Sequence, residues 1–275
     1  MSKLSILTVA ATVTATANFD IDSYLKNDLI KNPKMKYISS KVVKKEKLNG
    51  YGDWVAYLVY INLKYGNKDL KVPETFLVNE KLNLVVTGTR AIFDYKKHKF
   101  IGSNIRPKMD TSKYYDDSHL IAGNKDAKHK LVVFSDPMCP FCRQHVPKIY
   151  KDVKAHPNDL ALYYYHLPLQ IHPASAVITR VMEVLQKQGR VDDAFKLYTF
   201  PENMVNITDE DRILSEIKKR YKIDISKADI DKKEIKDAVN KDVDMSNSLF
   251  VKGTPTVYLD GKFDKKVTSY KQYIK

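Results

Sequence analysis

The stretch that decides the fold is residues 130–142, which read KLVVFSDPMCPFC. Its first half is a continuous apolar run, typical of a strand buried on both faces at the centre of a sheet. The run leads directly into Cys139 and Cys142, which are separated by Pro140 and Phe141. Proline suits the first position of a helix, where its missing N–H costs nothing, so the segment predicts a strand, a turn and a helix in succession.

The two cysteines are the only ones among the 275 residues. A disulfide between Cys139 and Cys142 closes almost no loop, so it would add little stability through the unfolded state. Thiol–disulfide exchange, in contrast, needs one thiolate that attacks and a second thiol that resolves the mixed disulfide. At a helix start, free N–H groups and the helix dipole lower the pKa of Cys139, whereas Cys142 lies one turn further in. The spacing therefore predicts a redox-active pair.

Two cysteines can also be half of a zinc site, and three histidines are available as further ligands: His145, His166 and His172. No second Cys-x-x-Cys follows, and the histidines lack the spacing of a ligand set. We therefore expect no metal, and no cofactor other than the redox-active disulfide between Cys139 and Cys142. The histidines are expected at the surface or in hydrogen bonds.

The composition is that of a soluble globular protein, with 43% hydrophobic and 29% charged residues. The formal net charge of +14 raises the question of nucleic-acid binding. However, basic residues are interleaved with acidic ones, as in Asp231-Lys232-Lys233-Glu234, and no basic stripe with stacking aromatics is present. The charge pattern favours a solvated basic surface over a nucleic-acid partner.

The N-terminus has the pattern of a secretory signal peptide over residues 1–17. Lys3 precedes a weakly apolar stretch, Leu4–Ala17, and residues 15–17 form a small-x-small cleavage site. The stretch is shorter than the ~20 residues that span a bilayer, so we expect cleavage rather than a retained anchor. Export would bring the cysteines to a compartment where disulfide chemistry is permitted.

Residues 18–103 predict a small α+β domain. A helical face over residues 19–29 has Asp20 or Asp22 available as its cap. Strand-like segments separated by turn signals follow over residues 36–44, 54–63, 75–78 and 82–89. The apolar pattern then lapses over residues 104–120, which predict a linker between two domains.

Residues 121–275 predict an α/β domain. After the strand at 130–135 and the helix that begins near Cys139, a further strand is expected at 160–165. Apolar residues at helical spacing predict a mostly helical insertion over 174–250. Gly253-Thr254-Pro255 then breaks the chain before a strand at 256–259, a turn at Asp260-Gly261 and a short helix near Ser269.

These motifs resemble a known family. Residues 134–142 are similar to the active-site segment of bacterial periplasmic disulfide oxidoreductases, and residues 253–255 resemble the thioredoxin-fold loop whose proline is cis. The α+β first domain, linker and helical insertion resemble the dimeric DsbC/DsbG type. This resemblance implies a cystatin-like N-terminal dimerisation domain and a thioredoxin-fold catalytic domain. Two catalytic domains would then face one cleft in a homodimer, with Thr75–Val78 as the candidate pairing edge.

The resemblance also implies roles for individual residues. Cys139 would be the exposed nucleophile and Cys142 the resolving cysteine. Asp136 would either tune the thiol pKa or support the turn between strand and helix, and both alternatives remain open. Four further residues are expected to line the active site and the substrate groove: Pro140, Phe141, Thr254 and Pro255.

The predicted function is that of a periplasmic thiol:disulfide interchange protein acting on secreted proteins. Pro140-Phe141 resembles the dipeptide of DsbG more than that of the oxidase DsbA, and Thr254 favours the same group, so isomerase or reductase activity is slightly favoured over oxidase activity. Expected partners are secreted or periplasmic protein substrates, a membrane thiol oxidoreductase that resets the pair, and a second copy of the chain. The alternatives are a holdase chaperone that uses the dimer cleft without thiols, and a metal-binding thioredoxin-like domain.

Overall fold

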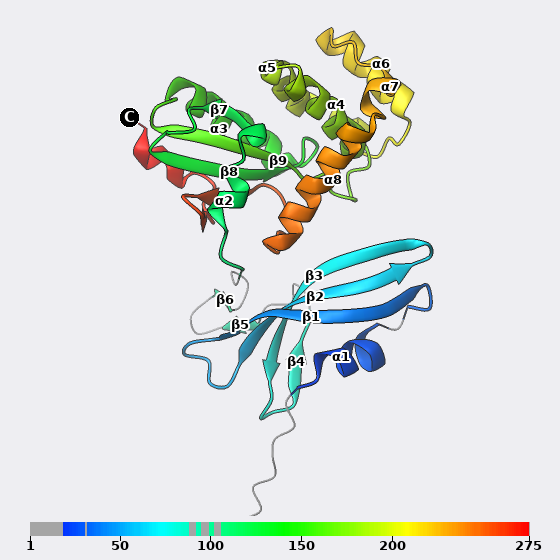
Figure 1. Ribbon diagram of the computed structural model, residues 1–275, viewed down its shortest axis with the longest axis vertical. Helices are drawn as coiled ribbons and strands as arrows, with labels where there is room; N and C mark the ends of the chain where they lie inside the picture. The colour runs from blue at the N-terminus through cyan, green and yellow to red at the C-terminus, as the bar shows by residue number, and fades with distance from the viewer. Residues whose placement is uncertain (1–18, 31, 88–91, 95–98, 102–105, 275) are drawn as a thin grey trace, which may run out of the picture. The chain divides into compact units, whose positions relative to one another are not determined.

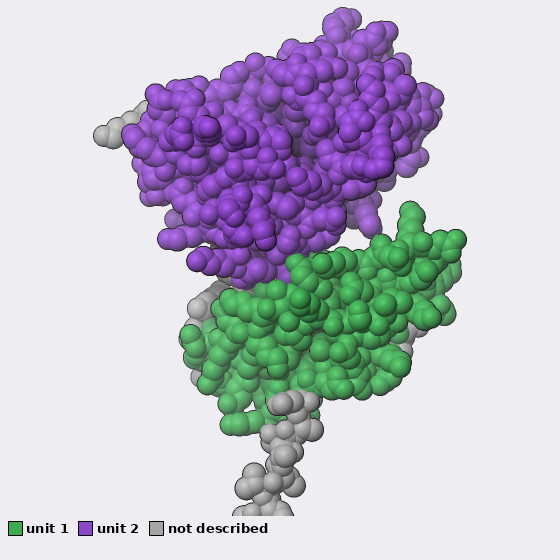
Figure 2. Space-filling model, in the orientation of Figure 1, with its two compact units in different colours: residues 1–105 green, residues 106–275 purple. Residues whose placement is uncertain are grey.

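The computed structural model describes residues 19–30, 32–87, 92–94, 99–101 and 106–274. The chain divides into two compact units, residues 1–105 and 106–275 (Figures 1 and 2). The signal peptide predicted over residues 1–17 lies outside the described residues. Each unit has its own buried core and is described by itself.

The first unit is one short helical segment and an antiparallel sheet. Helix α1 (Ile21–Tyr24) is capped by the Asp20 carboxylate and continues as a π-helical turn, η1 (Leu25–Leu29). The sheet has the order β1-β2-β3-β4, and its strands are β1 (Met35–Lys47), β2 (Val55–Tyr65), β3 (Lys68–Asn79) and β4 (Leu84–Val86). Ile21 and Leu25 pack with Tyr57 and Phe76, so the helical segment closes one face of the sheet.

Two expectations for this unit were wrong in detail. Strand β3 begins at Lys68 rather than at Thr75, because the turn at Gly66-Asn67 is tight enough for pairing to start at once. Only part of Thr75–Val78 can be an open edge, since Leu77 and Val78 pair with β4. Strands β5 (Ile92–Asp94) and β6 (Lys99–Ile101) form a separate antiparallel pair.

The second unit is built on a mixed sheet with the order β11-β10-β8-β9-β7. Its central strands β8 (His129–Ser135) and β9 (Leu160–His166) are parallel. Helix α3 (Pro140–Ala155) provides the crossover between them. The flanking strands run antiparallel to their neighbours: β7 (Leu120–Gly123), β10 (Thr256–Leu259) and β11 (Lys262–Phe263).

The two faces of this sheet are covered differently. Leu131 and Val133 of β8 pack with α3 and the insertion helices. Val132 and Phe134 face the opposite way, towards α2 (Thr111–Tyr114) and Leu249. Period-2 alternation within one strand thus places both of its faces in a core, as the continuous apolar run predicts.

The insertion predicted over 174–250 is helical, as expected. It comprises α4 (Ser175–Lys187), α5 (Val191–Lys196), η3 (Leu197–Thr199), η4 (Glu202–Met204), α6 (Glu210–Tyr221), α7 (Lys227–Ile230) and α8 (Lys233–Ser248). Helix α4 lies at its centre and contacts α5, α6, α7 and α8 (Figure 1). The short helix expected near Ser269 is the 3-10 helix η5 (Ser269–Tyr273).

Residues 106–120, expected as part of a linker, instead pack into the second unit. Met109 and Tyr114 are buried in its core, and the Tyr114 hydroxyl donates to the Met245 carbonyl oxygen at 2.8 Å. A 3-10 helix, η2 (Asp117–His119), then leads into β7. Within the residues that the structure describes, no helix is both long and apolar enough to cross a bilayer.

Candidate active site

The cysteine pair lies where the central strand β8 gives way to helix α3. Cys139 is the N-cap residue, with an extended backbone (φ −68°, ψ 123°), and Pro140 is the first residue of the helix. A residue before proline is restricted to extended conformations, so the Cys-Pro sequence itself determines where the helix begins. Cys142 follows one turn later, as predicted, on the face of α3 that packs into the core.

The buried carboxylate of Asp136 holds the turn before the cysteines. Its Oδ1 accepts backbone N–H groups from Met138 at 2.7 Å and from Cys139 at 3.2 Å. The Ser175 hydroxyl, at the start of α4, donates to the same oxygen. A buried carboxylate is costly unless it is hydrogen bonded, and this one has several donors.

The second oxygen of Asp136 fixes the loop that follows β9. Its Oδ2 accepts the Leu169 N–H at 2.9 Å and lies 2.9 Å from His172 Nδ1. Asp136 therefore ties the active-site turn to a loop more than thirty residues away. These contacts support the turn-forming role that the sequence left open for Asp136, whereas a tuning role stays a prediction.

Cys139 was expected to be exposed, and that expectation was wrong. Only 5% of its surface is accessible, because the loop at Thr254 lies over the sulfur: the Cys139 thiol donates to the Thr254 carbonyl oxygen at 3.3 Å. The Thr254–Pro255 peptide bond is cis, as predicted. The Thr254 hydroxyl is buried without a well-formed hydrogen bond among the described residues, and it is close enough to lower the pKa of Cys139.

The pKa of Cys139 is lowered from 9.0 to about 5. The largest cause is a hydrogen bond from the Cys142 thiol, and burial opposes it. The Thr254 hydroxyl and the backbone N–H groups of Cys142 and Phe141 lower the pKa further. These donors act at the N-terminus of α3, where helix N–H groups have no partners within the helix. Cys139 is therefore a thiolate at neutral pH.

The pKa of Cys142 is shifted in the opposite direction. Cys142 is fully buried, and this burial raises its pKa well above 9.0, with the hydrogen bond to Cys139 adding to the rise. Cys142 accordingly stays protonated, and its thiol donates a hydrogen bond to the Cys139 sulfur. The arrangement provides one nucleophilic sulfur at the surface of the core and one protonated sulfur behind it, as thiol–disulfide exchange requires.

Two apolar side chains near the cysteines are exposed to solvent. Phe141, between the cysteines, is 66% exposed, as its expected place in a substrate groove requires. Ile171 is 74% exposed and lies between Leu169 and His172, both of which are held by Asp136. The sequence did not point to Ile171, because its loop is linked to the active-site turn only through Asp136, more than thirty residues earlier. Pro255 is partly buried beside Thr254.

The histidines considered as metal ligands do not converge on the cysteines. His172 contacts Asp136, and His166 Nε2 lies 3.2 Å from Gln186 Oε1 in the core. In the described parts of the chain, no three His, Cys, Asp or Glu side chains are grouped so that they could hold a metal ion.

Comparison with known proteins gives the family. Residues 116–275, which include both cysteines and the cis-proline loop, match the sequence profile of the family described as Thioredoxin. This chain belongs to the thioredoxin family. The match begins at residue 116 and so covers the second unit.

Two curated Bacillus proteins are similar to the thioredoxin unit. “Probable disulfide bond formation protein D” of Bacillus cereus is 32% identical over 152 residues, which cover 50% of this chain and 68% of that protein. The protein of the same name from Bacillus anthracis is 30% identical over the same length. With these relatives, the chain is a thiol:disulfide oxidoreductase of the thioredoxin family.

Solved structures with a similar fold include BdbD from Bacillus subtilis in its oxidised form. It is 23% identical, with a TM-score of 0.45, over 55% of this chain and 86% of that one. A periplasmic thioredoxin-like protein from Salmonella enterica serovar Typhimurium is 20% identical, with a TM-score of 0.48, over 59% of this chain and 90% of that one. The family assignment itself rests on the sequence matches.

Replacement of Asp136 separates its two suggested roles. We expect Asp136→Ala to lower the free energy of unfolding by about 3 kcal/mol, because several buried donors lose their acceptor. Asp136→Asn keeps one acceptor oxygen and should lose less stability, with the thiolate absorbance of Cys139 titrating at the wild-type midpoint. Unchanged stability together with a shifted midpoint in Asp136→Asn would show that tuning is its main role.

Proposed function

We propose that this protein exchanges disulfides with secreted protein clients through Cys139 and Cys142. The observation that carries the proposal is the opposite pKa shift of two thiols that share one helix turn. A low pKa keeps Cys139 in the nucleophilic thiolate form at neutral pH, and it also makes Cys139 a good leaving group. Both properties speed exchange at this sulfur.

The exchange consists of two displacements. In the reducing direction the Cys139 thiolate attacks one sulfur of a client disulfide, and the other client sulfur leaves as a thiolate and takes up a proton. Cys142 then attacks the Cys139 sulfur, which forms the Cys139–Cys142 disulfide and releases the first client sulfur as a thiol. The same steps in reverse donate a disulfide to a reduced client.

The direction we favour is disulfide formation. The hydrogen bonds that stabilise the Cys139 thiolate exist only in the reduced pair, so they favour transfer of the disulfide to the client. The names of the Bacillus relatives, disulfide bond formation protein D, support the same direction. Isomerase or reductase activity, which the Pro140-Phe141 dipeptide favoured, is the alternative.

We expect a client to bind beside the exposed Phe141 ring. Thr254 and Pro255 supply the backbone that an extended client segment would follow, next to the Cys139 sulfur. The exposed Phe141 ring lies between the two cysteines in the chain, so clients with apolar side chains near their cysteine would be preferred. Such unfolded segments are what newly exported proteins present.

The setting of this chemistry is outside the cytoplasm. The signal-peptide pattern over residues 1–17 supports export, and disulfides persist in oxidising compartments such as the periplasm. After each turnover the pair must be reset, so we infer a membrane thiol oxidoreductase as the partner that accepts or supplies two electrons. Protein clients and this reset enzyme are the partners that the reaction needs.

The first unit is proposed as a homodimerisation domain of the DsbC/DsbG type. It has its own core and a sheet whose edge strand β1 carries the exposed apolar residues Ile38 and Val43. Strand β1 lies at one edge of the sheet, and its Ser40 N–H already donates to Asp22, so we propose pairing through the remainder of β1. Light scattering on the full chain should give about twice 31.7 kDa, and a mass of one chain would contradict this part of the proposal.

Trapping of clients tests the roles of the two cysteines. Cys142→Ser should accumulate mixed disulfides through Cys139, because no thiol remains to resolve them. The adducts appear on a non-reducing gel, and peptide mass spectrometry assigns the linked cysteine. Cys139→Ser is the matched control and should form none; adducts in that variant, with none in Cys142→Ser, would reverse the assigned roles.

The direction of exchange is tested with two forms of ribonuclease. In one assay the oxidised protein acts on reduced ribonuclease, and in the other the reduced protein acts on scrambled, fully disulfide-bonded ribonuclease. We expect ribonuclease activity to return faster in the first assay. Recovered ribonuclease activity is the readout in both assays. Efficient reactivation of the scrambled form without net oxidation of the reduced form would establish the isomerase alternative.

A further inference from the structure

Three buried hydroxyl groups lie in a row behind the cysteine pair. Ser135 Oγ is 2.5 Å from the Tyr198 hydroxyl, and the Tyr198 hydroxyl is 2.8 Å from that of Tyr164. The three side chains come from different elements, namely the end of β8, η3 of the insertion, and β9. All three are buried, so these hydroxyls exchange hydrogen bonds with one another rather than with solvent.

Cys142 belongs to the same buried cluster as Tyr164 and Tyr198. The Ser135 hydroxyl acts on Cys142 as a hydrogen-bond donor and lowers its pKa, although burial dominates and the net shift is upward. Negative charge on Cys142 in turn raises the pKa of both Tyr164 and Tyr198. The other titratable neighbours are Cys139, the buried Asp136 carboxylate and His166, whose ring centroid lies 5.0 Å from that of Tyr164.

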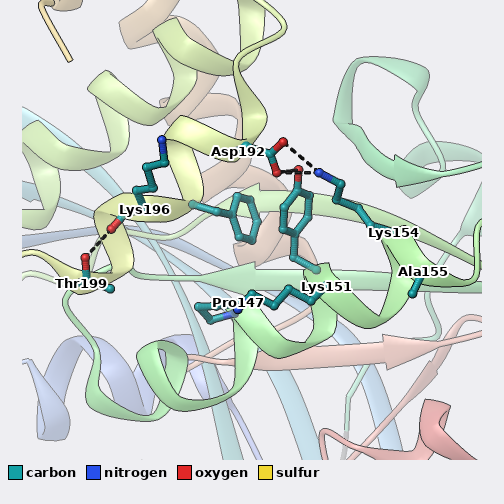
Figure 3. A pocket seen from close by; sticks show the side chains of 9 residues that line it. Pro147, Lys151, Lys154, Ala155, Asp192, Lys196 and Thr199 are labelled. Atoms are coloured by element: carbon teal, nitrogen blue, oxygen red, sulfur yellow. Dashed lines mark hydrogen bonds and ion pairs between the residues drawn. The ribbon is translucent and has the colours of Figure 1, made fainter. Parts of the chain in front are cut away.

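The insertion holds Tyr198 at this position by binding α3. The Asp192 carboxylate of α5 accepts hydrogen bonds from Tyr150 at 2.8 Å and from Lys154 at 2.6 and 2.8 Å. Figure 3 shows Asp192 facing Lys154. Both donors belong to α3 and flank a pocket of about 620 Å³ between α3 and α5. Phe195 stacks on the Tyr150 ring, with centroids 4.1 Å apart.

A second anchor lies on the other side of Tyr198. Arg143, one residue after Cys142, donates from Nη1 to the Phe200 carbonyl oxygen at 2.7 Å. Residues on both sides of η3 are therefore bound to the helix that carries the cysteines. The position of the Tyr198 hydroxyl relative to Cys142 is fixed through α3 itself.

We propose that Ser135, Tyr198 and Tyr164 form a hydroxyl chain that stabilises negative charge on the Cys142 sulfur when it resolves a mixed disulfide. The inference rests on the proposed function, in which Cys142 is the resolving cysteine. Either oxygen of each hydroxyl pair can donate, so Tyr164 can donate to Tyr198 and Tyr198 to Ser135. The Ser135 proton is then left for the Cys142 sulfur. Hydrogen bonds in such a chain polarise one another and strengthen the last one.

The chain acts during the second displacement only. Cys142 forms a bond to the Cys139 sulfur while the bond between Cys139 and the client sulfur breaks. The departing client sulfur takes up the proton that Cys142 gives up, so the step needs no other acid, base or oxidant. As the proton leaves Cys142, the buried sulfur becomes negative in a region of low polarity, where a donor hydroxyl has its largest effect. The three residues are positioning residues, since none of them forms a bond to a client.

Ellman's reagent separates the two displacements in the full-length reduced protein. Attack by Cys139 releases one coloured thiolate, and resolution by Cys142 releases the second. We expect Tyr198→Phe to leave the first phase unchanged and to slow the second about fivefold, because the Ser135 hydroxyl loses the donor that polarises it. Ser135→Ala should slow the second phase at least as much, and its rate should need a higher pH to reach its plateau.

Tyr165→Phe is the matched control. It removes another buried tyrosine hydroxyl from the same strand, one that donates to the Tyr114 carbonyl oxygen at 2.9 Å on the opposite face of the sheet. Both phases should stay at the wild-type rate in this variant. Tyr198→Phe and Ser135→Ala with a second phase as fast as the wild type across the pH range would overturn the hydroxyl chain.

Failure of the proposed function gives a different result. In that case Cys139→Ser would retain the first phase, or Cys142→Ser would retain the second, whatever the behaviour of Tyr198→Phe. An equal slowing of the second phase in Tyr165→Phe and Tyr198→Phe, with no change in pH profile, would assign the effect to packing and would also overturn the inference.

Discussion

The hydrogen bond from the Cys142 thiol to the Cys139 sulfur is the interaction on which the rest of the site depends. It is the largest single cause of the lowered pKa of Cys139, and it exists because Cys142 is too deeply buried to lose its proton. Two identical side chains on one helix turn thus differ in chemistry because their surroundings differ. The fold of the second unit buries Cys142 completely and places Cys139 at the N-terminus of α3, under the Thr254 loop.

The supports of this pair come from three distant parts of the chain. Asp136 links the turn before Cys139 to the loop after β9, so that the helix start cannot move independently of Leu169 and His172. The Thr254–Pro255 loop lies over the Cys139 sulfur. When Cys139 is a thiol, the Thr254 carbonyl oxygen accepts its proton in a hydrogen bond, and when it is a thiolate, the Thr254 hydroxyl donates to it. The helical insertion adds the buried hydroxyls behind Cys142, and its helix α5 is bound to α3. An insertion into a thioredoxin fold can therefore act on the chemistry without touching the client.

The sequence predicts what neighbouring residues determine. The strand at 130–135, the cap at Cys139 and the helix from Pro140 were expected, because local apolar runs and proline restrict the backbone directly. The cis bond before Pro255 was expected from the resemblance of residues 253–255 to the thioredoxin-fold loop. The burial of Cys139 was not expected, because Thr254, which covers it, lies 115 positions away in the chain. How closely Thr254 approaches Cys139 depends on how β10 pairs with β8. Strand β7 was missed because four residues carry too little pattern. Tyr198 and Ile171 were missed because only the assembled fold brings Tyr198 into one cluster with Cys142 and the loop of Ile171 to Asp136.

The most direct test of the central claim is a pH titration of the reduced protein in which carbon-13 labels on both cysteine β-carbons report each thiol separately. Cys139 should titrate with a midpoint near 5, while Cys142 stays protonated through neutral pH and beyond. Because the folded pKa of Cys139 is below the unfolded value of 9.0, its ionisation stabilises the reduced fold fully above pH 9 and ceases to do so as the pH falls through about 5. A Cys139 midpoint near 9, or deprotonation of Cys142 before Cys139, would contradict the account.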